Sequence, residues 1–147
     1  ESLVVSAILM MALVMLKMHI INTLPAFYGA SVFDWDKVNI DFYTYIISAP
    51  LQEFLCRGVL QGSIQKFLLG RFNWLWAIIL TSSLFGVFHI HESMALGILA
   101  VVGGIVWGAM YVRYENLIGA SINHFIIGNG LVILGLWDII VYGIAGV

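Results

Sequence analysis

The chain has 147 residues, of which 62% are hydrophobic and only 10% are charged, and its formal net charge is -2. Soluble domains carry about a quarter of their residues as charged side chains, so this composition excludes an ordinary soluble protein. A mean hydropathy of +1.03 predicts an integral membrane protein instead. The slight negative charge also argues against a nucleic-acid partner, because phosphate binding requires a basic surface.

Five apolar segments are expected to form membrane helices, because a spanning helix needs about 20 apolar residues. The expected fold is an all-α, polytopic transmembrane bundle of about five to six spans. The most N-terminal segment is not expected to be a signal peptide, since its sequence lacks a basic n-region and a small-residue cleavage site. The segments cover residues 3–21, 42–65, 73–90, 94–112 and 118–136, and an apolar tail at 137–147 is a candidate sixth.

The whole chain is expected to be one membrane domain in three parts. Residues 1–41 form an N-terminal helix with a polar loop, residues 42–136 form the core, and residues 137–147 form the tail. The loop with Lys66 and the loop with Arg113 are separated by two spans. They are therefore expected at the same side of the membrane, and the positive-inside rule makes that side cytoplasmic.

The second segment carries a charged pair, Glu53 and Arg57, one helical turn apart. This spacing places both side chains on one helix face with the acid N-terminal to the base, which is the favourable order. Ionisable groups are costly in hydrocarbon and mark candidate functional sites. Pro50 is expected to bend this helix just before Gln52 and to free backbone groups beside the pair.

The next two segments carry imidazoles and small residues. The third ends at His89, and the adjoining His91 and Glu92 are predicted to form a solvated turn rather than a metal site. The fourth has small residues at every fourth position, which favours close helix packing over chemistry. These residues are Ala100, Gly104 and Gly108.

Three helices together contribute acid, amide and imidazole groups, the combination that hydrolysis requires. Alternatively, Glu53, His89 and His124 could hold a zinc ion with a fourth position left for water. A third reading is that such histidines only form helix-helix hydrogen bonds, which contribute about 0.6 kcal/mol on average. The spacing of the residues leaves these alternatives open.

Three segments resemble the ordered motifs of the CPBP family. That family includes CAAX prenyl endopeptidases, bacteriocin-processing and self-immunity (Abi) proteins, and lysostaphin-resistance proteins. The resemblance implies a multi-pass protein of a bacterial inner membrane that cleaves a membrane-associated peptide within or beside the lipid bilayer. The segments are Gln52-Glu53-Phe54-Leu55-Cys56-Arg57, Phe85-Gly86-Val87-Phe88-His89 and Asn123-His124.

Carried over by position, the motif residues are Glu53, Arg57, His89 and His124, and two positions depart from the pattern. Gln52 stands where the family has a Glu that activates water, and Gln cannot accept a proton near neutral pH. The third motif expects Asn four residues after its His, but that position is Gly128. Asn129 comes one residue later, about 100° further round the helix, and would need a local bulge to stabilise an oxyanion.

Three functional hypotheses follow. In the first, the chain is an intramembrane endopeptidase in which His89 and Glu53 activate water and His124 polarises the scissile carbonyl. One version of it takes Gln52 as a designed, shape-preserving substitution that disables the enzyme. In the second, the chain is a catalytically silent member that binds neighbouring transmembrane subunits of a larger complex. In the third, the polar groups only lock the helices together.

Overall fold

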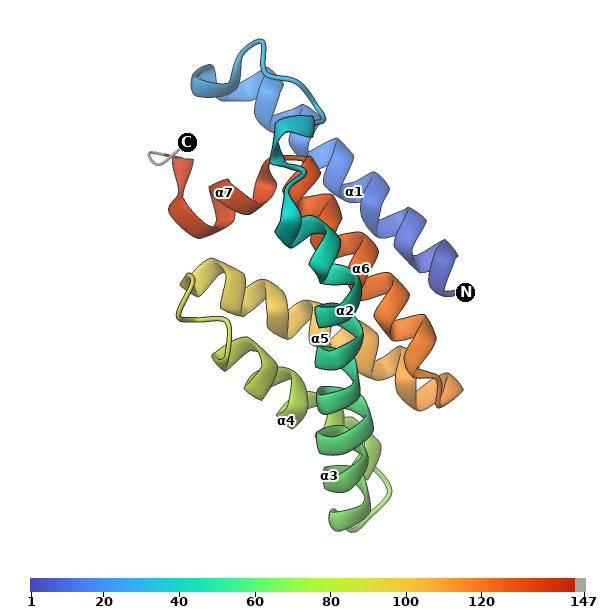
Figure 1. Cartoon of the computed structure of the whole chain (residues 1–147). Coiled ribbons are helices and arrows are strands. Elements are labelled where there is room, and N and C mark those ends of the chain that lie inside the picture. Colours follow the sequence, from blue (N-terminus) through green and yellow to red (C-terminus); the bar gives the residue numbers. More distant parts are fainter. Residues whose placement is uncertain (145–147) are drawn as a thin grey trace.

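The computed structural model describes residues 1–144, and every regular element in that range is helical. Figure 1 shows two long helix pairs, with α1 alongside α6 and α4 alongside α5, and α2 lying across both. The predicted all-α class is confirmed. The elements are α1 Ser2–Thr23, two short 3-10 turns at Pro25–Phe27 and Trp35–Lys37, α2 Ile40–Glu53, η3 Phe54–Gln61, α3 Gly62–Phe67, α4 Asn73–Val87, α5 Met94–Tyr114, α6 Leu117–Ile133 and α7 Leu136–Tyr142.

The predicted helix at 42–65 is one continuous helical run formed by α2, η3 and α3. It begins at Asn39, whose side chain accepts hydrogen bonds from the backbone N–H groups of Asp41 (2.9 Å) and Phe42 (3.3 Å), as a helix N-cap does. The helix continues through Pro50, and its departure from α geometry comes later, at Phe54. From there to Gln61 the backbone is a wider π-helix, a form often found at functional sites.

The small-residue stripe of α5 packs against α4, as its spacing predicts. A Cβ atom at Gly104 would lie 3.0 Å from Ser82. On the opposing helix, a Cβ atom at Gly86 would lie only 2.3 Å from Val101 and 2.7 Å from the Gly97 carbonyl oxygen. The two helices therefore approach at a distance that larger residues would forbid. This contact fixes the position of Phe85 and of the turn that follows α4.

The predicted fifth helix ends earlier than expected. Gly135 adopts a left-handed conformation (φ +61°) just beyond α6, a common way to end a helix. The chain then turns by 83° into α7. Of the tail predicted at 137–147, residues 145–147 lie outside the described residues.

The expected number of five to six spans is not confirmed. Among the described residues, α1 and α5 are long and apolar enough to cross a membrane, and α6 with α7 could form a third, broken span. The helix α4 is apolar but has only 15 residues, fewer than the roughly 20 that a span requires.

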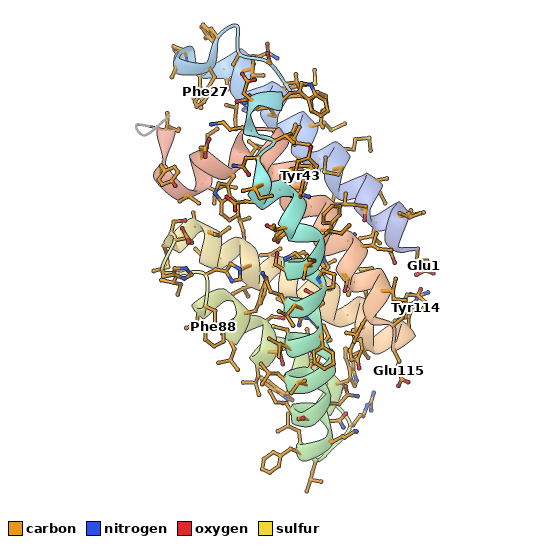
Figure 2. All side chains as sticks on the ribbon, in the orientation of Figure 1. Glu1, Phe27, Tyr43, Phe88, Tyr114 and Glu115 are labelled. Atoms are coloured by element: carbon orange, nitrogen blue, oxygen red, sulfur yellow. The ribbon has the colours of Figure 1, made fainter. Side chains whose placement is uncertain are left out.

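The outside of the bundle is rich in exposed apolar side chains, which cover the helices in Figure 2. The buried interior, in contrast, holds polar side chains on α1, α2, η3, α4 and α6. The loop after α3 and the end of α5 line a common cavity of about 750 Å³ that includes Lys66 and Val112. These two loops therefore lie at the same end of the molecule, as expected.

Candidate functional site

Glu53 and Arg57 form the predicted pair. The Arg57 Nε–H donates to Glu53 Oε2 at 3.1 Å, and both side chains are 0% exposed. Breaking a buried pair by removing one partner leaves an uncompensated charge, at a cost of about 3–5 kcal/mol. The ion pair thus holds an ionised carboxylate in the centre of the bundle.

His124 of α6 contacts the second oxygen of the same carboxylate. Its Nδ1 lies 2.9 Å from Glu53 Oε1, and the ring is 3% exposed. Because Glu53 is ionised beside Arg57, it can only accept hydrogen bonds, so His124 Nδ1 carries a proton. This contact joins residues that are 71 positions apart in the sequence. It fixes the orientation of the imidazole and keeps a proton on Nδ1.

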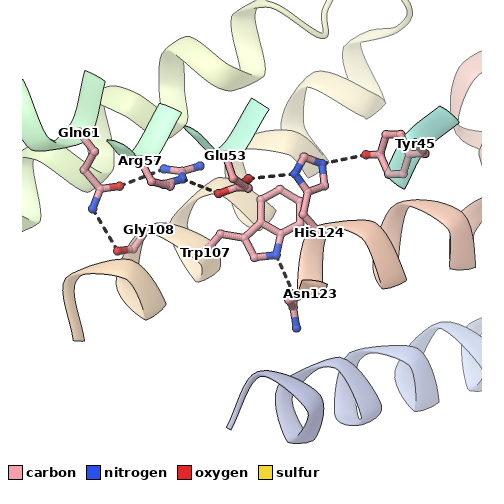
Figure 3. Close-up of polar contacts among 8 residues, drawn as sticks. All are labelled: Tyr45, Glu53, Arg57, Gln61, Trp107, Gly108, Asn123 and His124. Carbon is pink, nitrogen blue, oxygen red and sulfur yellow. Dashed lines mark hydrogen bonds and ion pairs between the residues drawn. The ribbon is translucent and has the colours of Figure 1, made fainter. Parts of the chain in front are cut away.

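The Glu53 pair is the middle of a longer row of hydrogen bonds, drawn in Figure 3. At one end, Arg57 Nη1 donates to Gln61 Oε1, and Gln61 Nε2 donates to the Gly108 carbonyl oxygen, both at 3.1 Å. At the other end, the Tyr45 hydroxyl lies 2.8 Å from His124 Nε2. We call the side chains of Tyr45, His124, Glu53, Arg57 and Gln61 the buried polar row.

Aromatic rings enclose the His124 end of the buried polar row. The Trp107 ring stacks on the imidazole with centroids 3.9 Å apart, and Phe85 meets it edge to face at 5.7 Å. Trp107 is itself fixed, because its Nε1–H donates to Asn123 Oδ1 at 2.7 Å. The Asn123 amide in turn donates to Ser6 of α1 at 2.8 Å. Such an apolar enclosure strengthens electrostatic interactions within it.

His89 has a different setting. It lies in the turn after α4, is half-buried, and packs on the other residue of its motif, Phe85, with ring centroids 4.5 Å apart. Its Nδ1–H donates to the Phe85 carbonyl oxygen at 2.7 Å. In the neutral ring this leaves the lone pair on Nε2, for which the described residues provide no hydrogen-bond partner. His89 and His124 therefore share Phe85 as a common wall.

The row and its surrounding residues can now be compared with known proteins. Residues 34–129 match the family described as type II CAAX prenyl endopeptidase Rce1-like. The chain belongs to this family. The predicted CPBP resemblance is thereby confirmed, and the matched range contains all three motifs. Comparisons with curated proteins and with solved structures gave no match.

Besides His89, two predicted site residues of this Rce1-like chain lie outside the buried polar row. Gln52, beside Glu53, has a buried Oε1 atom with no hydrogen-bond partner among residues 1–144. The Asn129 amide donates to the Phe42 carbonyl oxygen at 3.2 Å and so anchors the start of α2. The helix α6 runs on to Ile133. The predicted oxyanion role of Asn129 would require it to give up this bond.

Zinc ligation by Glu53, His89 and His124 stays a prediction. Within residues 1–144, no group of three His, Cys, Asp or Glu side chains is arranged to hold a metal ion. Both ring nitrogens of His124 already have partners, Glu53 and Tyr45. The carboxylate of Glu53 already accepts from Arg57. In this arrangement, with these contacts in place, the residues do not fit a metal.

Sequence reasoning missed three members of this site: Tyr45, Gln61 and Trp107. For one of them a periodic signal existed. Gln61 continues the four-residue spacing of Glu53 and Arg57, and side chains four apart are neighbours on a helix face, so its contact with Arg57 was open to deduction. Tyr45 is eight residues before Glu53, about 80° round an ideal helix from it, so its place beside His124 was not. No such signal marks Trp107, whose place depends on how α5 packs.

Proposed function

We propose that this Rce1-like chain is a membrane endopeptidase that hydrolyses a peptide bond of a prenyl-cysteine peptide at the membrane. The observation that carries the proposal is the contact between Glu53 and His124. It joins the first and third motifs in a buried site with aromatic walls and orients both groups. A purely structural pair of helices would not need this alignment beside a half-buried second imidazole.

Glu53 has the role of an orienting group in this proposal. It accepts one hydrogen bond from Arg57 and one from His124, so each of its oxygens already has a donor. Its negative charge stabilises the protonated imidazole of His124 when Nε2–H donates to the oxygen of the scissile carbonyl.

His89 is the general base. Its tautomer is set by the Phe85 carbonyl oxygen, which leaves Nε2 able to accept a proton from water. Attack of that water forms a tetrahedral intermediate, and the carbonyl electron pair moves to the oxygen. The protonated His89 then donates its proton to the leaving amine as the C–N bond breaks.

The test is cleavage of a fluorogenic farnesylated peptide by the purified protein in lipid nanodiscs. We expect the unaltered protein to cleave it. His89→Ala and His124→Ala should each lower kcat about 10²- to 10⁴-fold, the usual contribution of general acid-base groups. Absence of cleavage by the unaltered protein over a panel of prenylated peptides, or full activity in both variants, contradicts the proposal.

A catalytically silent member that binds the same peptide is the second candidate. Gln52 favours it, because an amide cannot take the proton that a Glu at this position would accept. Neighbouring transmembrane subunits would then cover the exposed apolar surface of the bundle. Binding of the farnesylated peptide without cleavage, together with co-purification in a defined complex, would favour the silent subunit.

The location in a bacterial inner membrane is part of the same proposal. The apolar helices and the family support an integral membrane protein. Separation of inner and outer membranes after expression in a bacterium tests the location, and recovery of the chain outside the inner-membrane fraction contradicts it.

A further inference from the structure

Tyr45 lies where a substrate carbonyl polarised by His124 would have to bind. Its hydroxyl is 2.8 Å from His124 Nε2, the only ring nitrogen that Glu53 leaves free. The phenol ring meets the imidazole edge to face, with centroids 5.7 Å apart, and stacks on Phe125 at 6.4 Å. The ring is thus held on two sides, and the hydroxyl can rotate about its own bond.

Gly128 makes room for this phenol. It lies one turn after His124 on α6, and therefore on the same helix face. A Cβ atom at this position would lie 2.3 Å from Tyr45 Cε1 and 2.7 Å from its hydroxyl oxygen. Any larger residue at 128 would displace the ring. The Tyr45 ring can therefore occupy its place beside His124 only because residue 128 has no side chain.

We propose that Tyr45 is a catalytic residue whose hydroxyl is the second hydrogen-bond donor to the oxyanion, beside His124 Nε2–H. The inference rests on the proposed endopeptidase function and adds a residue to it. Two donors 2.8 Å apart can both reach one oxygen at hydrogen-bond distance. In the free protein the Nε2–H of the protonated His124 donates to the Tyr45 oxygen, and on substrate binding both this N–H and the Tyr45 hydroxyl donate to the carbonyl oxygen.

The balance of the step is simple. The water oxygen forms a bond to the carbonyl carbon, and the π electron pair of the C=O bond moves to the oxygen. The water proton goes to His89 Nε2 and later to the leaving amine. Tyr45 and the protonated His124 both keep their protons throughout and donate only hydrogen bonds. The contribution of Tyr45 is greatest when the oxygen carries a full charge, so it acts on kcat more than on KM.

The first test compares Tyr45→Phe with Tyr43→Phe. Loss of one oxyanion donor lowers kcat about 10²- to 10³-fold, so Tyr45→Phe should lose this much with little change in KM. The ring and its packing are retained in that variant. Tyr43 lies two residues away, is 63% exposed, and its substitution should leave kcat unchanged. An unchanged kcat in Tyr45→Phe overturns the inference.

The second test moves the donor from one helix to the other. Gly128→Asn alone should lose activity because its side chain meets the Tyr45 ring. Tyr45→Ala removes both the ring and the donor. The double variant Tyr45→Ala with Gly128→Asn has space for the amide, which can donate in place of the hydroxyl. We expect its kcat to be at least about tenfold higher than that of Tyr45→Ala. This is part of the roughly 10²-fold loss in kcat that removal of one oxyanion donor causes. A double variant no faster than Tyr45→Ala contradicts the inference, because a structural role alone predicts no rescue.

A binding measurement separates this inference from the proposed function. The probe is a farnesylated peptide in which a phosphinate replaces the scissile amide, so that its tetrahedral anionic group imitates the intermediate. The neutral control is the same peptide with an uncleavable methylene group at that position. Tyr45→Phe should weaken phosphinate binding at least about tenfold and leave control binding unchanged, since transition-state analogues report such donors. If the unaltered protein does not cleave but this difference is present, the endopeptidase function fails, while the assignment of the Tyr45 hydroxyl as a donor to a tetrahedral anion beside His124 is supported. Equal phosphinate binding by the unaltered protein and Tyr45→Phe, or no binding by either, overturns the Tyr45 inference.

Discussion

His124 and His89 pack on the same phenylalanine, yet their surroundings differ in a way that separates two roles. Both ring nitrogens of His124 contact side chains, Glu53 and Tyr45, and the ring is almost fully buried. The His89 ring is half-buried, and within residues 1–144 its one hydrogen bond is to the carbonyl oxygen of Phe85, four residues earlier. A ring held from every side is suited to polarise a bond, and a ring with a free nitrogen is suited to move a proton.

The largest expected effect comes from breaking the buried polar row that holds His124. Arg57→Ala should lower the free energy of unfolding by about 3–5 kcal/mol, because it leaves the Glu53 carboxylate buried without its cation. Thermal unfolding in detergent, followed by helical circular dichroism, measures the change.

Arg113→Ala is the matched control for this change. The Arg113 side chain is 70% exposed and lies 3.5 Å from Glu1, and such surface pairs contribute at most about 1 kcal/mol. Equal losses of stability in the two variants would show that the buried polar row does not stabilise the bundle.

The proposed role of the half-buried His89 is tested by His89→Ala. We expect kcat to fall about 10²- to 10⁴-fold, while the unfolding temperature stays within error, since His89 has no side-chain hydrogen-bond partner among residues 1–144. Peptide cleavage and thermal unfolding are measured on the same preparation.

His91→Ala is a close control for His89→Ala. His91 makes the same kind of backbone contact, from Nδ1 to the Phe88 carbonyl oxygen at 2.7 Å, but it is exposed. It should therefore leave kcat unchanged. A loss of activity in His91→Ala as large as that in His89→Ala would remove the reason to single out His89.

A smaller effect is expected at Gln52. If His89 accepts the proton, Gln52→Glu should change kcat by less than about tenfold, since a second base adds little once one is in place. The measurement is kcat for the farnesylated peptide. A rise in kcat of about 10²-fold or more, the usual contribution of one general base, would instead show that Gln52 stands at the position of the missing general base.

The smallest effect is expected far from both histidines. Lys37 donates to Asp138 at 2.6 Å with 42% of its side chain exposed, so Lys37→Ala should cost less than about 1 kcal/mol. The hydrogen bond to Asp138 raises the pKa of Lys37. Its contribution is therefore present below the unfolded-state pKa and lost as the pH rises through the folded-state pKa. Unfolding measured from neutral to strongly alkaline pH tests this, and a contribution that grows with pH would contradict it.

Local features of the fold and site were predictable from the sequence. The Glu53–Arg57 pair follows from helical spacing, and the packing of Gly104 follows from its four-residue repeat. The end of α6 at Gly135 did not follow, because an isolated glycine in an apolar run is tolerated in membrane helices and gives no stop signal. The number of spans is not confirmed for a related reason, since apolar composition alone does not reveal where a helix breaks.

The contacts between helices were not predictable in this way. His124 lies 71 residues from Glu53, and no local rule states which oxygen or nitrogen of the two would meet. The motif resemblance named both residues without their geometry. Tyr45 belonged to no motif, and its role depends on the space left at Gly128, which only the packing of α2 on α6 reveals.

The most direct measurement of the central claim is a double-mutant cycle between Glu53 and His124 on kcat/KM for the farnesylated peptide. If Glu53 acts by orienting His124, the two form a unit, and the losses of Glu53→Gln and His124→Ala should not multiply. The account predicts a double variant no slower than His124→Ala alone. Independent losses that multiply in the double variant would contradict it.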